Sequence, residues 1–351
     1  MTQANSIAAP AYSALKRDRV LLAHGGGGQL TDELLADHVF PHISNRILDD
    51  LLDASDLGRQ SGRLAFTIDS FVVQPWQFPG GDVGRLAIAG TVNDLAVTGA
   101  KPLAIALGVI LAEGFPLANL DTVMNSVAAT AKEANVRIAT GDTKVVGHGH
   151  ADGIYLITAG VGTIPTKRRL NPNRVRPGDK LILNGPIGEH GLAVMLAREM
   201  PDVRSVVTSD VAPLNSLTEA LLAAGGNNVT FMRDPTRGGL SGLCADLAQR
   251  ANLRVVLEES QILVHPAARH AADMLGLDPL DIANEGKVFV AVKPRAAEKV
   301  LRAMKSHPLG KDAAIVGHVE AASEGFCELH TQIGGRRIVQ KPYGEQLPRI
   351  C

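Results

Sequence analysis

The chain has 351 residues, of which 45% are hydrophobic and only 3% aromatic, and its formal net charge is -1. This length exceeds one ordinary hydrophobic core, so we expect two domains with cores of Ala, Val, Leu and Ile. The near-neutral charge excludes a basic surface for nucleic acid, and the scarcity of aromatic residues argues against a binder of single strands.

The cysteines and the apolar runs indicate the compartment. Cys244, Cys327 and Cys351 have no paired spacing, which excludes a disulfide framework and a zinc site. Residues 1–20 form a leader without the apolar core of a secretory signal, and no apolar run approaches transmembrane length. We therefore expect a cytoplasmic protein with no membrane or nucleic-acid partner.

A run of four glycines at positions 25–28 is the first feature of the N-terminal domain, which we place at residues 21–170. Glycines do not hold a helix or strand interior. They suit a mobile flap whose backbone N–H groups close over phosphates, so Gly26 and Gly27 are candidate nucleotide contacts, with Thr31 as the cap of the next helix. A plain flexible loop explains the same glycines, and the Gly-Lys-Ser/Thr ending of a P-loop is absent.

Three acidic residues follow predicted apolar strands or lie in a predicted apolar helix. A buried strand at 64–68 ends at Asp69, a helix at 82–98 carries Asp94, and a strand at 136–140 ends in a segment with Asp142 and Lys144. Mg²⁺ prefers hard oxygen ligands, so Asp69, Asp94 and Asp142 are predicted to form a magnesium cluster, to which Lys144 adds a charge for phosphate. Any one of these acids alone is more simply a solvated surface residue; their combination favours the site.

The remaining elements predict a mixed α/β (α+β) fold. We expect further strands at 103–111 and 154–162 and a helix at 117–135 in the first domain. In a second domain, at residues 171–340, we expect helices at 189–199, at 213–224 and from Leu240 to Arg250, and strands at 180–183, 255–258, 288–292, 314–319 and 326–330.

Two motifs of the second domain carry polar residues between apolar segments. Asp234-Pro-Thr-Arg237-Gly238-Gly239 opens a helix, and a glycine pair at a helix start beside an arginine suits an anion. A structural turn with a helix cap explains this motif equally well. Glu285 precedes a strand in Asn284-Glu285-Gly286, where composition alone indicates a solvated loop acid.

The C-terminal segment, residues 341–351, contains two prolines and a glycine and has no periodicity, which is typical of a flexible tail. It ends on Cys351. One interpretation is a chance terminal residue. The other is a tethered thiol that is chemically loaded and presented to an active site.

Taken together, these motifs resemble those of the aminoimidazole-ribonucleotide-synthetase-like (PurM-like) ATP enzymes. The residues that carry the resemblance are Thr67-Ile-Asp69-Ser70, Thr91-Val-Asn93-Asp94, Gly141-Asp142-Thr143-Lys144, Asp234 to Gly239 and Asn284-Glu285-Gly286. The ending Pro348-Arg-Ile-Cys351 resembles the tail of the hydrogenase-maturation members. The resemblance covers the chain from Val20 onwards. It implies two α/β domains, N-terminal sheets that pair across a homodimer, and ATP near the domain interface.

The resemblance also implies a reaction. A carbamoyl group, placed on Cys351 by the carbamoyltransferase HypF, is dehydrated with ATP and Mg²⁺ to a thiocyanate, and the cyanide passes to iron on the scaffold complex HypC–HypD. The same resemblance assigns proton transfer to Lys144 and Glu285. A lysine acts as a base only where its pKa is lowered, and otherwise Glu285 takes the proton, so both remain candidates. The nucleotide contacts that it implies are Gly26, Gly27, Asn93, Asp234, Arg237, Gly238 and Gly239.

Two other functions compete with this one. A selenophosphate synthetase would carry a reactive cysteine and a lysine in its glycine loop, and Leu22-Ala-His24-Gly25 has neither. A non-catalytic scaffold or metal-handling protein of hydrogenase assembly would draw its support from His148 and His150, which are a weak metal signal without further ligands.

Overall fold

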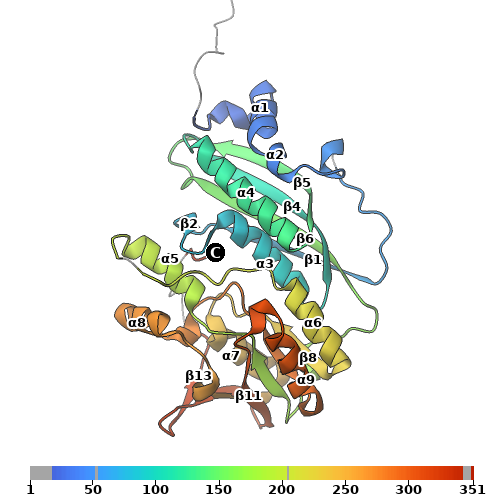
Figure 1. The fold of residues 1–351 in the computed structure, drawn as a ribbon, viewed down its shortest axis with the longest axis vertical. Helices are drawn as coiled ribbons and strands as arrows, with labels where there is room; N and C mark the ends of the chain where they lie inside the picture. The colour runs from blue at the N-terminus through green and yellow to red at the C-terminus, as the bar shows by residue number, and fades with distance from the viewer. Residues whose placement is uncertain (1–17, 52–53, 204, 343–348) are drawn as a thin grey trace, which may run out of the picture.

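The structure is a computed structural model that describes residues 18–51, 54–203, 205–342 and 349–351. Its strands form two large sheets, one in each half of the chain, and a short ribbon of β2 (Gln77–Phe78) and β3 (Gly81–Asp82). The two halves are stacked along the long axis of the molecule, with α3 between them (Figure 1). This arrangement confirms the predicted mixed α/β fold with two domains.

The first domain is built on a four-stranded sheet in the order β1-β6-β4-β5. Its strands are β1 (Arg63–Phe71), β4 (Lys101–Ala112), β5 (Arg137–Val146) and β6 (Ile154–Ile164). β6 pairs antiparallel with β1 and β4, whereas β4 and β5 run parallel, so β1 and β5 are the two edges of the sheet. The prediction that Asp69 and Asp142 follow their strands is wrong, because both strands extend past these residues.

Four helices accompany this sheet: α1 (Gln29–His38), α2 (Phe40–Ile43), α3 (Val83–Val97) and α4 (Leu117–Glu133). Asp82 caps the start of α3, and its carboxylate accepts a hydrogen bond from the Arg85 N–H at 2.9 Å. Apolar and small residues make up most of α3, and every residue except Arg85 and Asp94 is buried, because the helix packs against β1 and β6 of its own sheet and against α6 of the second domain. Asp94 is therefore one of two charged residues on a helix that is otherwise buried and mostly apolar or small.

The second domain is built on a seven-stranded sheet in the order β13-β12-β9-β11-β7-β10-β8. The strands are β7 (Lys180–Leu183), β8 (Val229–Arg233), β9 (Leu253–Glu258), β10 (Phe289–Val292), β11 (Ala314–Ala321), β12 (Phe326–His330) and β13 (Arg336–Val339). Only β9 and β12 pair in parallel within the described sheet.

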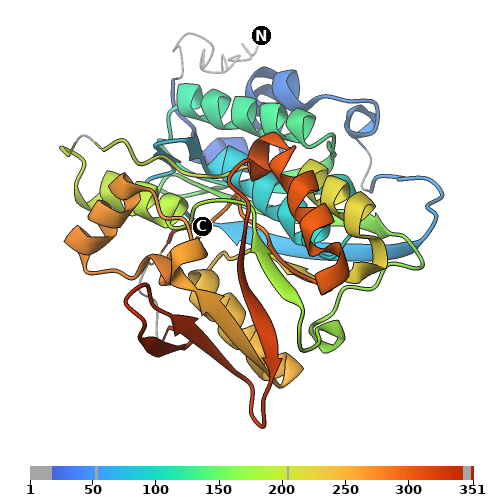
Figure 2. The same cartoon turned by 60° about the horizontal axis from the view of Figure 1, so that its bottom comes forward.

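Helices cover both faces of this second sheet. They are α5 (Glu189–Glu199), α6 (Asn215–Gly225), α7 (Gly239–Ala251), α8 (Pro266–Leu275) and α9 (Pro294–Lys305). α7 shares one apolar core with the sheet, and α6 and α9 share another. Figure 2 shows α5 and α8 on one side of the molecule and α6 and α9 on the other.

The sequence located many of these elements but not all. The strands at 180–183 and 326–330 and the helix at 189–199 are confirmed to the residue. β8, β13, α8 and α9 were not predicted, although α8 and α9 each begin with a proline, a common first residue of a helix. Among the described residues, no helix has the length and apolar composition that crossing a membrane requires.

Candidate functional site

Carboxyl groups from both domains converge at the domain junction. They are Asp69 on β1, Asp94 on α3, Asp234 after β8 and Glu285 before β10. Burial first, and then the charge of Asp94, raises the pKa of Asp69 to about 6, and burial with Asp94 and Asp69 raises that of Asp234 to about 7. Burial also raises the pKa of Glu285 well above its usual value, with the other three carboxyls adding to the effect. Carboxylates that repel one another in this way lie close together.

Asp94 and its neighbour Asn93 have different roles at this junction. The Thr67 hydroxyl donates a hydrogen bond to Asp94 at 2.7 Å and fixes the carboxylate beside β1. Asn93 is buried and joins the two domains: its amide donates to the carbonyls of Ala212 and Glu285, both at 3.1 Å, and its oxygen accepts from the Leu214 N–H at 2.7 Å. The Asn93 side chain is therefore engaged with the protein itself, and the nucleotide contact that the resemblance implies stays a prediction.

The backbone at Glu285 is fixed by hydrogen bonds to the Asp210 carboxylate. The N–H groups of Glu285 and Gly286 each donate to the Asp210 carboxylate at 3.1 Å, and the Lys287 ammonium lies 2.8 Å from it. Burial opposes ionisation of Asp210, but the Lys287 charge and these hydrogen bonds outweigh burial and lower its pKa. A Cβ at Gly286 would lie 1.9 Å from the Asp210 carbonyl oxygen, so only glycine fits after Glu285.

The glycine pair at the start of α7 is required by backbone geometry. Gly238 caps α7 with a φ of 77°, and Gly239 follows with a φ of 58° and a Cβ position that would meet the Leu280 oxygen at 2.4 Å. The structural-turn interpretation of this motif is thus supported. The exposed Arg237 lies near enough to the carboxyl cluster for its charge to lower the pKa of Asp69. That this helix start binds an anion stays a prediction.

Asp142 and Lys144 lie apart from this cluster within one chain. They stand on β5, at the sheet edge opposite β1, and the Lys144 ammonium lies 2.7 Å from the Asp142 carboxylate. Both side chains are exposed. Across the described residues, no three His, Cys, Asp or Glu side chains are placed to hold a metal ion. The predicted cluster of Asp69, Asp94 and Asp142 is therefore not formed by a single chain.

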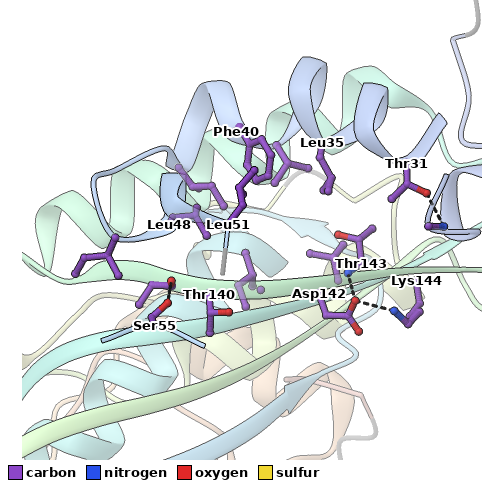
Figure 3. A pocket seen from close by; sticks show the side chains of 18 of the residues that line it. Thr31, Leu35, Phe40, Leu48, Leu51, Ser55, Thr140, Asp142, Thr143 and Lys144 are labelled. Carbon is purple, nitrogen blue, oxygen red and sulfur yellow. Dashed lines mark hydrogen bonds and ion pairs between the residues drawn. The ribbon is translucent and has the colours of Figure 1, made fainter. Parts of the chain in front are cut away.

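A cavity of about 280 Å³ lies beside Asp142 and Lys144, between β5 and the N-terminal helices (Figure 3). Its apolar wall comes from α1, α2 and the short helix η2 (Leu48–Asp50), and includes Leu35, Phe40 and Leu48. Its polar side includes Thr31, Thr140, Asp142, Thr143, Lys144 and the backbone of Gly25 and Gly27. An apolar interior with a few polar groups is typical of a small-molecule site.

The glycine run borders this cavity rather than the carboxyl cluster. It continues a short 3-10 helix, η1 (Leu22–Gly25), and Gly25 packs so closely on Val145 that a Cβ would lie 2.7 Å from the Val145 nitrogen. The prediction that Thr31 caps the next helix is wrong, since α1 starts at Gln29 with Gly28 at the cap. The Thr31 hydroxyl instead accepts from the Gly27 N–H at 2.9 Å and donates to the His24 carbonyl at 2.8 Å, which closes the loop on itself.

The chain ends in a docked segment beside the carboxyl cluster. The N–H groups of Val72 and Gln74, just past β1, donate to the carbonyls of Cys351 and Arg349, both at 3.2 Å. Ile350 is 2% exposed within the core of the first domain, and Cys351 packs against the same core. The expected flexible tail is therefore wrong for residues 349–351; residues 343–348 of that tail lie outside the described residues.

The three cysteines differ in their surroundings. Cys244 on α7 and Cys327 on β12 are buried together in the core of the second domain, and burial raises the pKa of the Cys244 thiol. Cys351 is half-buried at the domain junction.

Sequence reasoning missed Asp210, Lys287 and His190, which surround the docked segment and Glu285. The one sequence signal for these residues was that Lys287 and His190 are polar side chains next to apolar segments.

Comparisons with known proteins agree with this geometry. The chain matches the models described as AIR synthase related protein, N-terminal domain, over residues 52–164, and C-terminal domain, over residues 176–330. It is similar to a carbamoyl dehydratase HypE from Bradyrhizobium diazoefficiens, with 44% identity over 330 residues that cover 94% of this chain and 95% of that protein.

Two solved structures are similar over nearly their whole length. A hydrogenase maturation protein HypE in complex with ATP has a TM-score of 0.90 and 37% identity, and the match covers 94% of this chain and 99% of that chain. The structure of a HypE–HypF complex has a TM-score of 0.77 and 40% identity, with 90% of this chain and 100% of that chain covered.

Proposed function

The chain belongs to the AIR synthase-related protein family, among its HypE carbamoyl dehydratases, and from this premise we propose that it dehydrates a carbamoyl group on the Cys351 thiol to a thiocyanate with ATP. The product supplies the cyanide ligand of the iron centre in NiFe hydrogenase. The observation that carries the proposal is the docked C-terminus, which places the half-buried Cys351 beside the domain junction where Glu285 and three aspartates converge.

The reaction removes one oxygen and two protons from the carboxamide. The carboxamide oxygen attacks the γ-phosphorus of ATP, and ADP leaves. The nitrogen loses its two protons, the C–O bond breaks, and phosphate departs with the former carboxamide oxygen, which leaves S–C≡N on Cys351. Phosphorylation is needed because an unmodified carbonyl oxygen is a poor leaving group, and the site must then stabilise phosphate charge and accept protons.

Glu285 is the base that the geometry favours. Its carboxyl is 3% exposed, and burial with its acidic neighbours raises its pKa well above the usual value, which makes the carboxylate a stronger base than a solvated one. Lys144 has a 62% exposed side chain that is paired with Asp142. We assign to Lys144 the stabilisation of phosphate charge rather than proton transfer.

The cavity under α1 and α2 is the proposed position of the adenine base. Its apolar wall suits a flat ring. The backbone of Gly25 and Gly27 and the side chain of Lys144 lie at its polar side, where the phosphate groups of the nucleotide would extend out of the cavity. The family member solved with ATP supports a nucleotide site in this fold. Arg237 and the start of α7 remain candidate contacts for the phosphates from the second domain.

The carboxyl cluster fits Mg²⁺ that arrives with the nucleotide. Mg²⁺ usually binds through one or two carboxylates together with waters and substrate phosphates, so a complete protein cage is not required. The raised pKa values of Asp69 and Asp234 show carboxyls that repel one another, and a divalent cation between them would relieve this repulsion. Asp69 and Asp94, together with the phosphates of the nucleotide, would hold the ion, and it would neutralise charge on the transferring phosphoryl group.

A homodimer would unite the cavity with this cluster. β1 and β5 have unpaired outer edges in the described chain, and Leu64, Phe66 and Ile68 of β1 are 64–71% exposed on one face. Such a surface is typical of an interface. If β1 of each chain meets β5 of the other, the exposed face is covered and Asp142 and Lys144 of the partner subunit approach Asp69.

The proposal also includes two partners. The HypE–HypF complex supports a carbamoyltransferase of the HypF type as the enzyme that loads Cys351. The HypC–HypD scaffold, as the acceptor of cyanide, follows from the family resemblance alone. Intact-mass and peptide mass spectrometry after incubation with ATP and a HypF-type carbamoyl donor system tests the function directly. We expect a carbamoyl and then a cyano mass shift on the Cys351 peptide, and none after Cys351→Ala. A shift on Cys244 or Cys327 with Cys351 unmodified would reject the mechanism.

A further inference from the structure

The ring of His190 touches the chain terminus on one side and the second domain on the other. His190 lies in the first turn of α5 and is fully buried. Its Nε2 lies 3.0 Å from the Ile350 carbonyl oxygen, and its Nδ1 lies 2.8 Å from the Ser209 hydroxyl. The ring of Phe78 packs edge-on against it, with centroids 5.4 Å apart. The imidazole is therefore fixed by contacts on both nitrogens and on its face.

These partners assign the tautomer of His190. A carbonyl oxygen only accepts, so Nε2 carries the proton and donates to Ile350. Burial lowers the pKa of His190, which favours the neutral ring, and Nδ1 then accepts. The Ser209 hydroxyl therefore donates to Nδ1 while it accepts from the Val211 N–H at 3.1 Å. All donors and acceptors in this chain of bonds are satisfied only while Ile350 is docked.

The same chain of bonds continues to Glu285. Ser209 directly precedes Asp210, whose carboxylate holds the N–H groups of Glu285 and Gly286 and the Lys287 ammonium. Asp210 is also close enough to His190 for each charge to affect the other's pKa. The docked terminus and the backbone of Glu285 are thus joined through the side chain of His190 and the short segment 209–210.

From these contacts we propose that His190 is a positioning residue, which couples docking of the C-terminal residues 349–351 to the placement of the segment that carries Glu285. The inference rests on the proposed function, because its purpose is to bring the base into position only when Cys351 is docked. When the terminus leaves to meet another protein, the His190 Nε2–H loses its acceptor and the link between the terminus and the 209–210 segment is broken, whereas the Ser209 N–H still donates to the Pro79 carbonyl. Docking of the substrate thiol would in this way assemble the base.

The other end of the docked segment offers a matched control. The Arg349 guanidinium contacts the Val72 carbonyl at 3.0 Å, pairs with Asp152, and lies over the Tyr155 ring at 5.8 Å. None of these contacts reaches the 209–210 segment. Asp152→Asn should therefore loosen docking without altering the link to Glu285, whereas His190→Phe keeps the ring volume and removes both hydrogen bonds of the imidazole.

The first measurement is the rate at which iodoacetamide alkylates Cys351 in the full-length protein, read by peptide mass spectrometry. Buried Cys244 and Cys327 serve as internal controls for global unfolding. We expect alkylation to rise roughly threefold to tenfold in both His190→Phe and Asp152→Asn, the change that loss of one hydrogen bond or ion pair produces. This assay needs no ATP or carbamoyl donor, so it is independent of whether the proposed reaction occurs.

The second measurement is amide hydrogen exchange of the peptides that cover residues 209–213 and 284–288. Deletion of residues 349–351 from the otherwise natural chain should speed exchange there, as should His190→Phe, whereas Asp152→Asn should speed it much less. In the His190→Phe background, the deletion should add nothing further, because the coupling is already lost. A residue with a merely structural role would give additive effects.

Two results would overturn the inference. One is an unchanged exchange rate at 284–288 after deletion of residues 349–351, which by itself decides the matter if His190→Phe does not fold. The other is equal, additive acceleration by the deletion in the natural and His190→Phe backgrounds. If the exchange data show coupling but no cyano product forms on Cys351, the proposed function fails while the structural coupling stands.

Discussion

Asp69 and Gly141 lie in one row across the first sheet, on its two opposite edges. The register that connects them runs through Thr158 on β6 and Leu107 on β4. Asp142 follows Gly141, so in one chain it is separated from Asp69 by three strand spacings, about 14 Å of sheet. A dimer that joins the β1 edge to the β5 edge would remove this separation.

The first prediction tests this dimer by complementation. Asp94→Asn and Asp142→Asn should each fold and lose Mg-dependent ATP hydrolysis, since each removes a carboxylate from the proposed site. If Asp94 and Asp142 of one site come from different subunits, a mixed dimer of the two variants retains one intact site. Random re-pairing of equal amounts should then restore about a quarter of the natural ATPase activity.

A site formed within a single chain predicts the opposite. Each subunit of the mixed dimer then carries a defect, and mixing restores no activity. Equal activity before and after re-pairing would therefore reject the shared site, and natural activity in either single variant would reject its residue as part of the site.

The second prediction concerns the exposed face of β1. Phe66→Asp places a charge in the middle of a patch whose central side chain is 71% exposed, and it should convert a dimer to monomers without unfolding the domain. Sedimentation velocity measures the change. Ile338→Asp on β13 is the matched control, because Ile338 is also an exposed aliphatic residue, 54% exposed, but lies in the other domain. A dimer that survives Phe66→Asp would locate the interface elsewhere.

The sequence predicted the individual acids better than their arrangement. Asp69 and Asp94 follow from the residues, because each interrupts an apolar pattern, whereas the role of Glu285 follows from the family resemblance. The structure brings all three together with Asp234. Asp142 lies apart from them in one chain, because the strand order β1-β6-β4-β5 does not follow the order along the chain, and only the proposed dimer would bring it near. Asp210 was missed since it lies in a segment without periodicity, and its importance comes from bonds to residues 285–287, which no local pattern records.

The third prediction uses the pKa of Asp234, which is raised in the folded state from 3.8 to about 7. The folded protein resists ionisation of this group, so its destabilising effect is absent below pH 3.8, grows as the pH rises, and is complete above pH 7. Asp234→Asn should therefore raise the free energy of unfolding by up to about 4 kcal/mol at pH 8, and by about 2 kcal/mol at pH 5. Urea denaturation without nucleotide at both pH values measures it.

The exposed Asp142→Asn variant is the control for this experiment and should shift the free energy of unfolding by less than about 0.5 kcal/mol at either pH. A gain for Asp234→Asn that is equal at pH 5 and pH 8 would show that the carboxyl is not the source of the destabilisation.

The fourth prediction compares two lysine–aspartate pairs of almost equal length. Lys287 lies 2.8 Å from Asp210 with both side chains buried, and Lys144 lies 2.7 Å from Asp142 with both exposed. Lys287→Ala should cost about 3–5 kcal/mol of unfolding free energy, because it leaves a buried carboxylate without its cation. Lys144→Ala should cost less than about 1 kcal/mol. Similar losses in urea denaturation would contradict the role of Lys287 as the buried partner of Asp210, which holds the Glu285 segment.

The last prediction concerns Ile350, which is 2% exposed and anchors the chain terminus in the core of the first domain. Ile350→Ala removes most of this buried side chain, a change that costs about 2–5 kcal/mol in a packed core. Here the loss should fall on docking rather than on the whole fold, because only residues 349–351 need leave the surface. We expect iodoacetamide to alkylate Cys351 at least about tenfold faster, with little change in Tm, since 1.4 kcal/mol corresponds to a factor of ten. Loading of Cys351 by a carbamoyl donor should persist, whereas conversion to the cyano form should slow, because the thiol spends less time at the junction that holds Glu285. An equal loss of loading and of conversion in Ile350→Ala would contradict the prediction. Docking of the terminus would then not be required specifically for conversion to the cyano form.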